Sequence, residues 1–246
     1  VHGWTADHRV WGPVARRLVD AGRRVVLYDQ RGHGGSTAGS SGYTMEAIGD
    51  DVRAVLEGLD LHDVVLAGHS MGGMAVEGFA VRHKDVLAER VAALVLVSTL
   101  SRSVLPNHWA AEARYRMVTS PVTQRAVESR RAAPWLVRGS EGRRPAWSHL
   151  VATSESFAAT PPGVRGDFVR AMAEFDFGEA LAGVSLPVVV IAGTRDTLTP
   201  YSANRRIAEA IPGARLETVS GAGHQLVFEA PDRLAEVLLE VSAAAD

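Results

Sequence analysis

Short runs of apolar, mostly β-branched residues alternate along the chain with longer stretches in which apolar residues recur every three or four positions. Runs of the first kind predict strands that are buried on both faces of a sheet. They lie at residues 24–28, 63–67, 91–97, 187–192 and 215–219. Because strands that alternate with helices form parallel sheets, the pattern predicts an α/β fold with a mainly parallel sheet.

Stretches of the second kind predict amphipathic helices, each with one apolar face. One apolar stripe runs through residues 10–18, a second through 45–59 and a third through 234–241. Thr44 is placed to cap the second helix, and Pro231 fits the first turn of the last one.

Residues 101–184 break this alternation. The segment has no comparable strand run and contains the Pro- and Gly-rich breaks RAAPW, GSEGRRP and TPPG. We interpret it as a helical cap inserted after the strand at 91–97, so that residues 1–100 and 185–246 form the core. Within residues 101–180, eleven Arg outnumber eight Asp and Glu. We interpret this excess as a solvated surface, and a preference for substrates with an anionic tail is the alternative.

The composition excludes several classes of function. A net charge of -2 gives no electrostatic reason for a nucleic-acid or anionic membrane partner. Cys is absent, which excludes disulfides, thiolate catalysis and Cys-ligated metals and suits a cytoplasmic location. No apolar run reaches the ~20 residues that span a bilayer. We therefore expect no nucleic-acid partner and no membrane span, and the oligomeric state stays open.

The stretch LAGHSMGG contains the pattern G-x-S-x-G, with Gly68, Ser70 and Gly72 at its fixed positions. It directly follows a predicted strand and precedes a helical stretch, which is the context that the pattern requires. Small neighbours tolerate a strained turn on which the hydroxyl projects above the carboxyl end of the sheet, beside a helix N-terminus. Ser70 is therefore a candidate nucleophile, and an incidental Ser in a Gly-rich turn is the alternative.

A nucleophilic serine needs a base to take its proton and a group that orients the base. Asp196 lies just beyond the predicted strand at 187–192, and His224 lies in a Gly-rich loop after the strand at 215–219. Because parallel strands end at one edge of the sheet, both side chains are expected beside Ser70. Purely structural roles in these loops are the alternatives for both residues.

Together these motifs resemble the α/β-hydrolase-fold serine hydrolases, from the HG pair at residues 2–3 through YDQRGHGGS, GHSMGG and GTRDTLTP to GAGH. The resemblance implies a three-layer α/β-hydrolase fold with a cap, of the esterase or lipase type. It implies Ser70 as nucleophile, His224 as general acid and base, and Asp196 as the acid that orients His224.

The resemblance also implies an oxyanion hole formed by the backbone N–H groups of Trp4 and Met71. Such donors are each worth ~3 kcal/mol when the tetrahedral oxyanion forms. The Gly-rich stretch at residues 29–36 lacks the Lys of a phosphate loop and the Gly spacing of a dinucleotide site, so we interpret it as a structural turn. The nine His show no metal-ligand spacing. We therefore expect no cofactor and no metal, and we expect Glu77 to make a polar contact at a helix surface.

The reaction implied is two-step acyl transfer, in which a serine attacks a carbonyl and water then releases the acid. The favoured function is hydrolysis of a small to medium apolar carboxylic ester. Thioester, lactone and carbon–carbon bond hydrolysis stay open, as do cofactor-free perhydrolysis of the haloperoxidase type and a ligand-binding role on a hydrolase scaffold.

The first residues resemble the end of a strand. In the related fold, the strand that ends at the HG pair lies between the strands at 24–28 and 63–67, and Val1 is its last residue here. We therefore expect a chain truncated at its N-terminus, which lacks ~20 to 30 residues by the usual lengths of strands and turns.

Overall fold

A four-stranded parallel sheet forms the centre of the molecule in a computed structural model, which describes residues 1–39, 41–143 and 145–244. The strands lie in the order β1 (Val64–His69), β2 (Val91–Val97), β3 (Val188–Gly193) and β4 (Arg215–Val219). Each begins within one residue of a predicted strand. Every residue of β3 and all but one of β2 are buried, as expected for strands covered on both faces.

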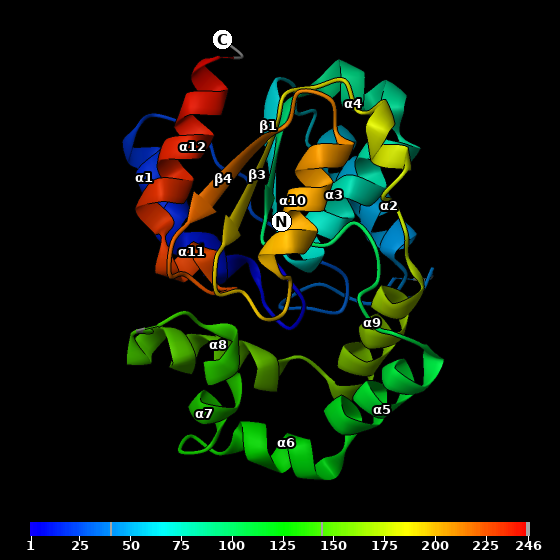
Figure 1. Ribbon diagram of the computed structural model, residues 1–246, viewed down its shortest axis with the longest axis vertical. Helices are drawn as coiled ribbons and strands as arrows, with labels where there is room; N and C mark the ends of the chain where they lie inside the picture. The colour runs from blue at the N-terminus through cyan, green and yellow to red at the C-terminus, as the bar shows by residue number, and fades with distance from the viewer. Residues whose placement is uncertain (40, 144, 245–246) are drawn as a thin grey trace.

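Helices cover both faces of the sheet, which makes three layers (Figure 1). One face carries η1 (His8–Trp11), α1 (Gly12–Asp20), α11 (Leu226–Glu229) and α12 (Pro231–Ala243). The other carries α2 (Met45–Gly58), α3 (Met71–Arg82), α4 (Lys84–Arg90) and α10 (Tyr201–Ala210). Alternate residues of β2 point to the two faces, so Val95 packs in one apolar cluster and Leu94 in the other. The predicted α/β fold is confirmed.

The predicted helix starts are also confirmed. The hydroxyl oxygen of Thr44 accepts a hydrogen bond from the N–H of Ala47 at 3.0 Å, which satisfies one of the free donors at the start of α2. Pro231 is the first residue of α12, where its missing N–H costs no helical hydrogen bond.

The strand expected at residues 24–28 is wrong, because residues 23–30 form no strand. A strand exists only where a neighbouring backbone completes its hydrogen bonds. The backbone next to β1 is that of Val1, whose amino group donates to the Ala67 carbonyl oxygen at 2.6 Å. The carbonyl oxygen of Val1 in turn accepts from the N–H of His69 at 3.0 Å. Residues 24–28 therefore have no strand partner within the described parts of the chain.

Between β2 and β3, the chain forms a helical insertion at residues 101–184. Its helices are α5 (His108–Thr119), α6 (Pro121–Glu128), α7 (Ala133–Val137), η2 (Arg138–Ser140), α8 (Trp147–Ala159), α9 (Pro162–Glu174) and η3 (Ala180–Gly183). Figure 1 shows α5 to α8 on the side of the molecule where β3 and β4 end. The described residues of the insertion include no strand, and a single antiparallel bridge joins Arg102 to Asp176. The division into core and cap domains stays a prediction.

None of the helices formed by the described residues has the length and apolar composition needed to cross a bilayer.

Candidate active site

Ser70 occupies a sharp turn between β1 and α3. Its backbone has φ 55° and ψ -123°, and a left-handed conformation of this kind costs a non-Gly residue on the order of 1–3 kcal/mol. Hydrogen bonds from Ser70 N–H to the Val97 carbonyl at 2.9 Å and from Gly73 N–H to the Ser70 carbonyl at 2.8 Å hold the turn. Glycine is required at Gly68, because a Cβ there would lie 2.3 Å from the carbonyl oxygen of Gly72.

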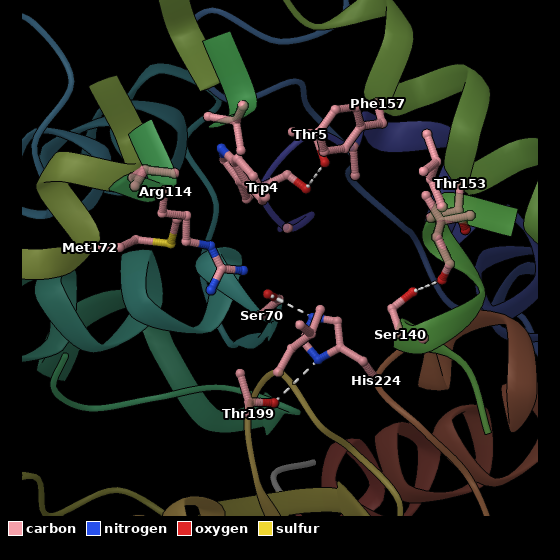
Figure 2. A pocket seen from close by; sticks show the side chains of 18 of the residues that line it. Trp4, Thr5, Ser70, Arg114, Ser140, Thr153, Phe157, Met172, Thr199 and His224 are labelled. Atoms are coloured by element: carbon pink, nitrogen blue, oxygen red, sulfur yellow. Dashed lines mark hydrogen bonds between the residues drawn. The ribbon is translucent and has the colours of Figure 1, made fainter. Parts of the chain in front are cut away.

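The loops that follow β3 and β4 bring Asp196 and His224 to this turn. His224 Nε2 lies 3.0 Å from Ser70 Oγ, and His224 Nδ1 lies 2.9 Å from Asp196 Oδ2. A carboxylate accepts only, so Nδ1 carries the proton and Nε2 is free to accept the hydroxyl proton of Ser70. Figure 2 shows Ser70 and His224 facing each other at the bottom of a cavity. The structure thus brings the three predicted residues into one continuous chain of hydrogen bonds.

Asp196 is held as an anion by its surroundings. Its Oδ1 accepts the backbone N–H groups of Leu198 and Thr199 at 2.9 and 2.8 Å, and its Oδ2 accepts the Thr199 hydroxyl at 2.6 Å. Burial raises the pKa of Asp196, but the neighbouring His224 and these hydrogen bonds outweigh burial and lower the pKa to about 2. The carboxylate is therefore charged at neutral pH and can stabilise a protonated His224.

The two predicted oxyanion donors, Trp4 and Met71, belong to the segments that adjoin Ser70. Met71 begins α3 directly after Ser70, and the segment that contains Trp4 runs against the turn, since a Cβ on Gly3 would lie 3.0 Å from the Cβ of Ser70. Neither backbone N–H donates to an acceptor within the described residues. Free N–H groups next to a nucleophile are what an oxyanion requires. Their catalytic role stays a prediction.

Sequence reasoning left His2 without a role. Burial, followed by the charge of His33, lowers the pKa of His2 to about 3, so its ring is neutral. Its Nε2 accepts the N–H of Gln30 at 2.9 Å, and its carbonyl oxygen accepts the Gln30 side-chain amide. These contacts fix the segment that carries Trp4. The HG pair at residues 2–3 was the signal in the sequence that could have revealed this role.

A cavity of about 660 Å³ opens above Ser70 and His224, between the edge of the core and the insertion (Figure 2). Its lining is mostly apolar and includes Met74, Leu100, Leu105, Val118, Val127, Phe157, Val169 and Met172. Five further lining residues are large, apolar and exposed, namely Val104, Met117, Val122, Leu136 and Leu198. A volume of this size suits a small to medium organic ligand.

A model of the family described as alpha/beta hydrolase fold matches residues 1–231. This chain belongs to the alpha/beta hydrolase family. The match covers both the turn at Ser70 and the loop that carries His224.

Curated relatives of this α/β hydrolase bear two kinds of name. The pimeloyl-[acyl-carrier protein] methyl ester esterase of Aromatoleum aromaticum is 32% identical over 250 residues, which cover 98% of this chain and 96% of that protein. The non-heme chloroperoxidase CPO-A1 of Kitasatospora aureofaciens is 28% identical over 247 residues, which cover 95% of this chain and 86% of that protein. Among solved structures, a bromoperoxidase from Bacillus anthracis superimposes with a TM-score of 0.86 at 24% identity, covering 98% of this chain and 89% of its own. That structural likeness shows the fold alone.

His69, at the variable position of the G-x-S-x-G motif, joins the turn at Ser70 to the loop that carries His224 in this α/β hydrolase. Its Nε2–H donates to the carbonyl oxygen of His224 at 2.8 Å. Burial, and then the charge of His224, lowers the pKa of His69 to about 3, so the ring stays neutral. The motif itself assigns no role to this position, which is why sequence reasoning missed it.

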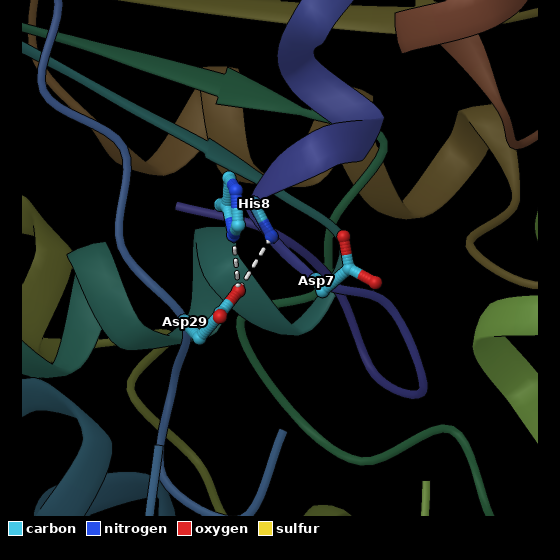
Figure 3. Close-up of side chains that lie close together, drawn as sticks. All are labelled: Asp7, His8 and Asp29. Atoms are coloured by element: carbon cyan, nitrogen blue, oxygen red, sulfur yellow. Dashed lines mark hydrogen bonds and ion pairs between the residues drawn. The ribbon is translucent and has the colours of Figure 1, made fainter. Parts of the chain in front are cut away.

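Among the residues that the structure describes, one cluster outside the cavity has metal-ligand spacing. Ligand atoms of Asp7, His8 and Asp29 lie within 4.8 Å of one another (Figure 3). These ligand atoms already form hydrogen bonds within the protein. Arg9 donates to both carboxylate oxygens of Asp7, at 2.9 and 2.7 Å. The carboxylate of Asp29 accepts from His8 Nδ1 at 2.8 Å and from the N–H of Gly35 at 2.9 Å. These hydrogen bonds account for the cluster as a brace between two loops, and we assign no metal to it.

Proposed function

We propose that this α/β hydrolase cleaves a carboxylic ester, or a related acyl bond, of a small to medium apolar substrate through an acyl-enzyme intermediate. One observation carries the proposal. An unbroken chain of hydrogen bonds links Ser70 Oγ through His224 to the ionised carboxylate of Asp196 at the bottom of an apolar cavity.

In the proposed acylation step, His224 Nε2 takes the proton of Ser70 as Oγ attacks the carbonyl carbon. The negative charge that develops on the carbonyl oxygen is stabilised by the N–H groups of Trp4 and Met71 and by the N-terminal end of α3. The imidazolium is stabilised by Asp196 and then gives its proton to the departing alcohol oxygen. The acyl group remains on Ser70.

Deacylation repeats the sequence with water as nucleophile. His224 takes a proton from the water, which attacks the acyl carbon, and returns that proton to Ser70 Oγ as the acid leaves. The insertion acts as a cap in this proposal, because it supplies most of the cavity lining and thereby limits the acyl and alcohol groups that fit.

A panel of p-nitrophenyl esters of increasing acyl length, combined with fluorophosphonate labelling, tests this function. Replacing Ser70 with Ala is expected to lower kcat by a factor of about 10⁴ or more and to abolish labelling. Ser140→Ala is a matched control, since Ser140 lines the same cavity but its hydroxyl donates to the Val137 carbonyl at 2.7 Å. If the Ser70 variant labels and hydrolyses like the parent, the serine-nucleophile mechanism is wrong.

Perhydrolysis is a second candidate, favoured by the relative named a chloroperoxidase, which aligns with 95% of this chain. Here the acyl-enzyme would form from a carboxylic acid with loss of water, and hydrogen peroxide would replace water in deacylation to release a peracid. The peracid then oxidises a halide. Halogenation of monochlorodimedone in acetate buffer with peroxide and bromide, lost in Ser70→Ala, is the expected signature. Binding without any Ser70-dependent turnover would instead favour a ligand-binding role.

A further inference from the structure

The described residues of the cavity lining include one permanently charged side chain. Among the described lining residues, Arg114 on α5 carries a full positive charge, and none carries a carboxylate. Figure 2 shows the guanidinium of Arg114 projecting into the cavity, on the side of Ser70 and His224. Arg114 is half-buried and faces the cavity.

Arg114 has no hydrogen-bond acceptor and no ion-pair partner within the described residues, whereas its neighbours do. Arg116 and Arg170 both bind Glu112 at 3.0 Å, so the carboxylate on α5 is already shared by two cations. The five N–H donors of a guanidinium are costly to withdraw from water without acceptors. An arginine held beside an apolar cavity without a partner is therefore prepared to bind an anionic ligand.

A second cation lies behind the cavity wall. Arg165 is fully buried, with its Cζ 4.8 Å from the ring centroid of Phe157, which lines the cavity. Its side chain donates to Gln124, and no carboxylate among the described residues pairs with it. Glu128 is the acidic group that interacts with Arg165, and it does so without a direct ion pair, so its attraction offsets the charge of Arg165 only in part. Both arginines make the potential inside the cavity positive.

We propose that the cavity takes esters that carry a carboxylate, and that Arg114 binds this carboxylate while Ser70 attacks the ester. The inference rests on the proposed ester hydrolysis and specifies its substrate class. A carboxylate matches the single free guanidinium in charge and can accept two parallel N–H bonds from it. Arg165 lies behind the wall, so Arg114 is the one cation among the described lining residues, and the second charge of a phosphate dianion would enter the apolar lining without a cation to pair with. The apolar residues between Arg114 and Ser70 then contact the methylene chain of the substrate.

Paired substrates test this specificity directly. Monomethyl dicarboxylates from succinate to suberate are compared at pH 7.5 with the methyl alkanoates of equal carbon number, and methanol release is measured. A second series of substrates places the carboxylate on the alcohol part of the ester. Butyl butanoate is compared with the analogue in which the butyl chain ends in a carboxylate. The parent protein is expected to favour the carboxylate ester in kcat/KM by a factor of about 10 to 100 at one chain length of one series.

Arg114→Met should remove that preference, so that the carboxylate ester and the neutral ester have similar kcat/KM values, because one charge-assisted contact is lost. Arg114→Glu should reverse it. Arg116→Met is the matched control, since Arg116 lies two positions along α5, faces away from the cavity and makes an exposed ion pair of little energetic worth. It is expected to keep the preference of the parent.

Binding to Ser70→Ala separates this inference from the proposed function. Isothermal titration with monomethyl adipate and methyl hexanoate is expected to give tighter binding of the carboxylate ester, by a similar factor, and the difference should vanish in Ser70→Ala/Arg114→Met. If both esters bind equally and Arg114→Met changes neither, the inference is wrong, while Ser70-dependent turnover of neutral esters would leave the proposed function intact. If no ester is hydrolysed, the titration alone decides the inference.

Discussion

Glu141 should contribute stability that is lost as pH rises, and Glu141→Gln should remove this contribution. The side chain is 5% exposed, and its carboxylate oxygens have no well-formed hydrogen bond among the described residues, although the Thr153 side chain lies near them. Burial, together with the charge of Glu229, raises the pKa of Glu141 from its ordinary value of 4.5 to about 7. Glu141 lies where the insertion contacts the loop that carries His224, next to the hydrogen bond from His224 N–H to the Ser140 carbonyl at 2.8 Å.

The magnitude follows from linkage between protonation and folding. Unfolded chains release the Glu141 proton near pH 4.5, whereas the folded protein keeps it to about pH 7. Between these values the unfolded state binds fewer protons, so the stability contributed by neutral Glu141 is complete below pH 4.5 and is lost as pH rises through 7. A shift of this size corresponds to about 3 kcal/mol, a large part of the 5–15 kcal/mol of a typical domain.

Urea denaturation of the parent and of Glu141→Gln at intervals from pH 5 to 8.5 measures this effect. Only the difference between the two proteins isolates Glu141, because burial lowers the pKa values of His2 and His69 to about 3, and these groups add stability as pH rises toward 6.5. Because part of the effect is already lost at pH 5, we expect the difference in free energy of unfolding between variant and parent to change by about 2.5 kcal/mol, in favour of the variant, from pH 5 to 8.5. Glu174→Gln, at an exposed position, is the control. If the free energy of unfolding of Glu141→Gln depends on pH in the same way as that of the parent and of this control, the reasoning is refuted.

Three further predictions concern single side chains. Asp196→Asn should lower kcat by about 10⁴ while the circular dichroism spectrum is retained, because the amide favours the wrong tautomer of His224. Ser70→Gly should raise the free energy of unfolding by about 1 kcal/mol in urea titrations, since Gly adopts φ 55° without strain, and should abolish hydrolysis. Glu77→Met should stabilise the protein at pH 7.5 by about 1–3 kcal/mol, measured by thermal or urea unfolding. Glu77 is 1% exposed and has no hydrogen-bond partner among the described residues, and burial raises its pKa well above the ordinary value. A less stable Glu77→Met protein would mean that this carboxyl group has a favourable contact.

Local rules explain why the candidate site could be predicted from the sequence. The turn at Ser70 needs small residues at fixed positions, and a strand and a helix on either side of it, all of which are visible within a few residues. Asp196 and His224 each follow a β-branched run, and the ends of parallel strands meet at one edge. No knowledge of distant contacts was needed to bring the three together.

The features that sequence reasoning missed depend on contacts between distant segments. The run at 24–28 has the composition of a strand, but a strand also needs a neighbour, and composition does not report one. Glu77 was expected at a helix surface, yet all residues of α3 from Met71 to Ala80 are buried between α2 and the sheet. The direction of Arg114 depends on how α5 packs across the cavity, which no local pattern reports.

The insertion and the proposed catalytic base are joined by hydrogen bonds, so specificity and chemistry are coupled in this protein. Thr197 Oγ1, next to Asp196, donates to the Gly139 carbonyl at 2.9 Å, and His224 N–H donates to the Ser140 carbonyl at 2.8 Å. A displacement of residues 139–140 would therefore move the loops of both the base and its orienting acid, and a misplacement near 1 Å can cost about 10²-fold in rate. Shortening the insertion to admit larger esters should for this reason lower kcat for all esters alike, unless residues 139–142 are kept in place.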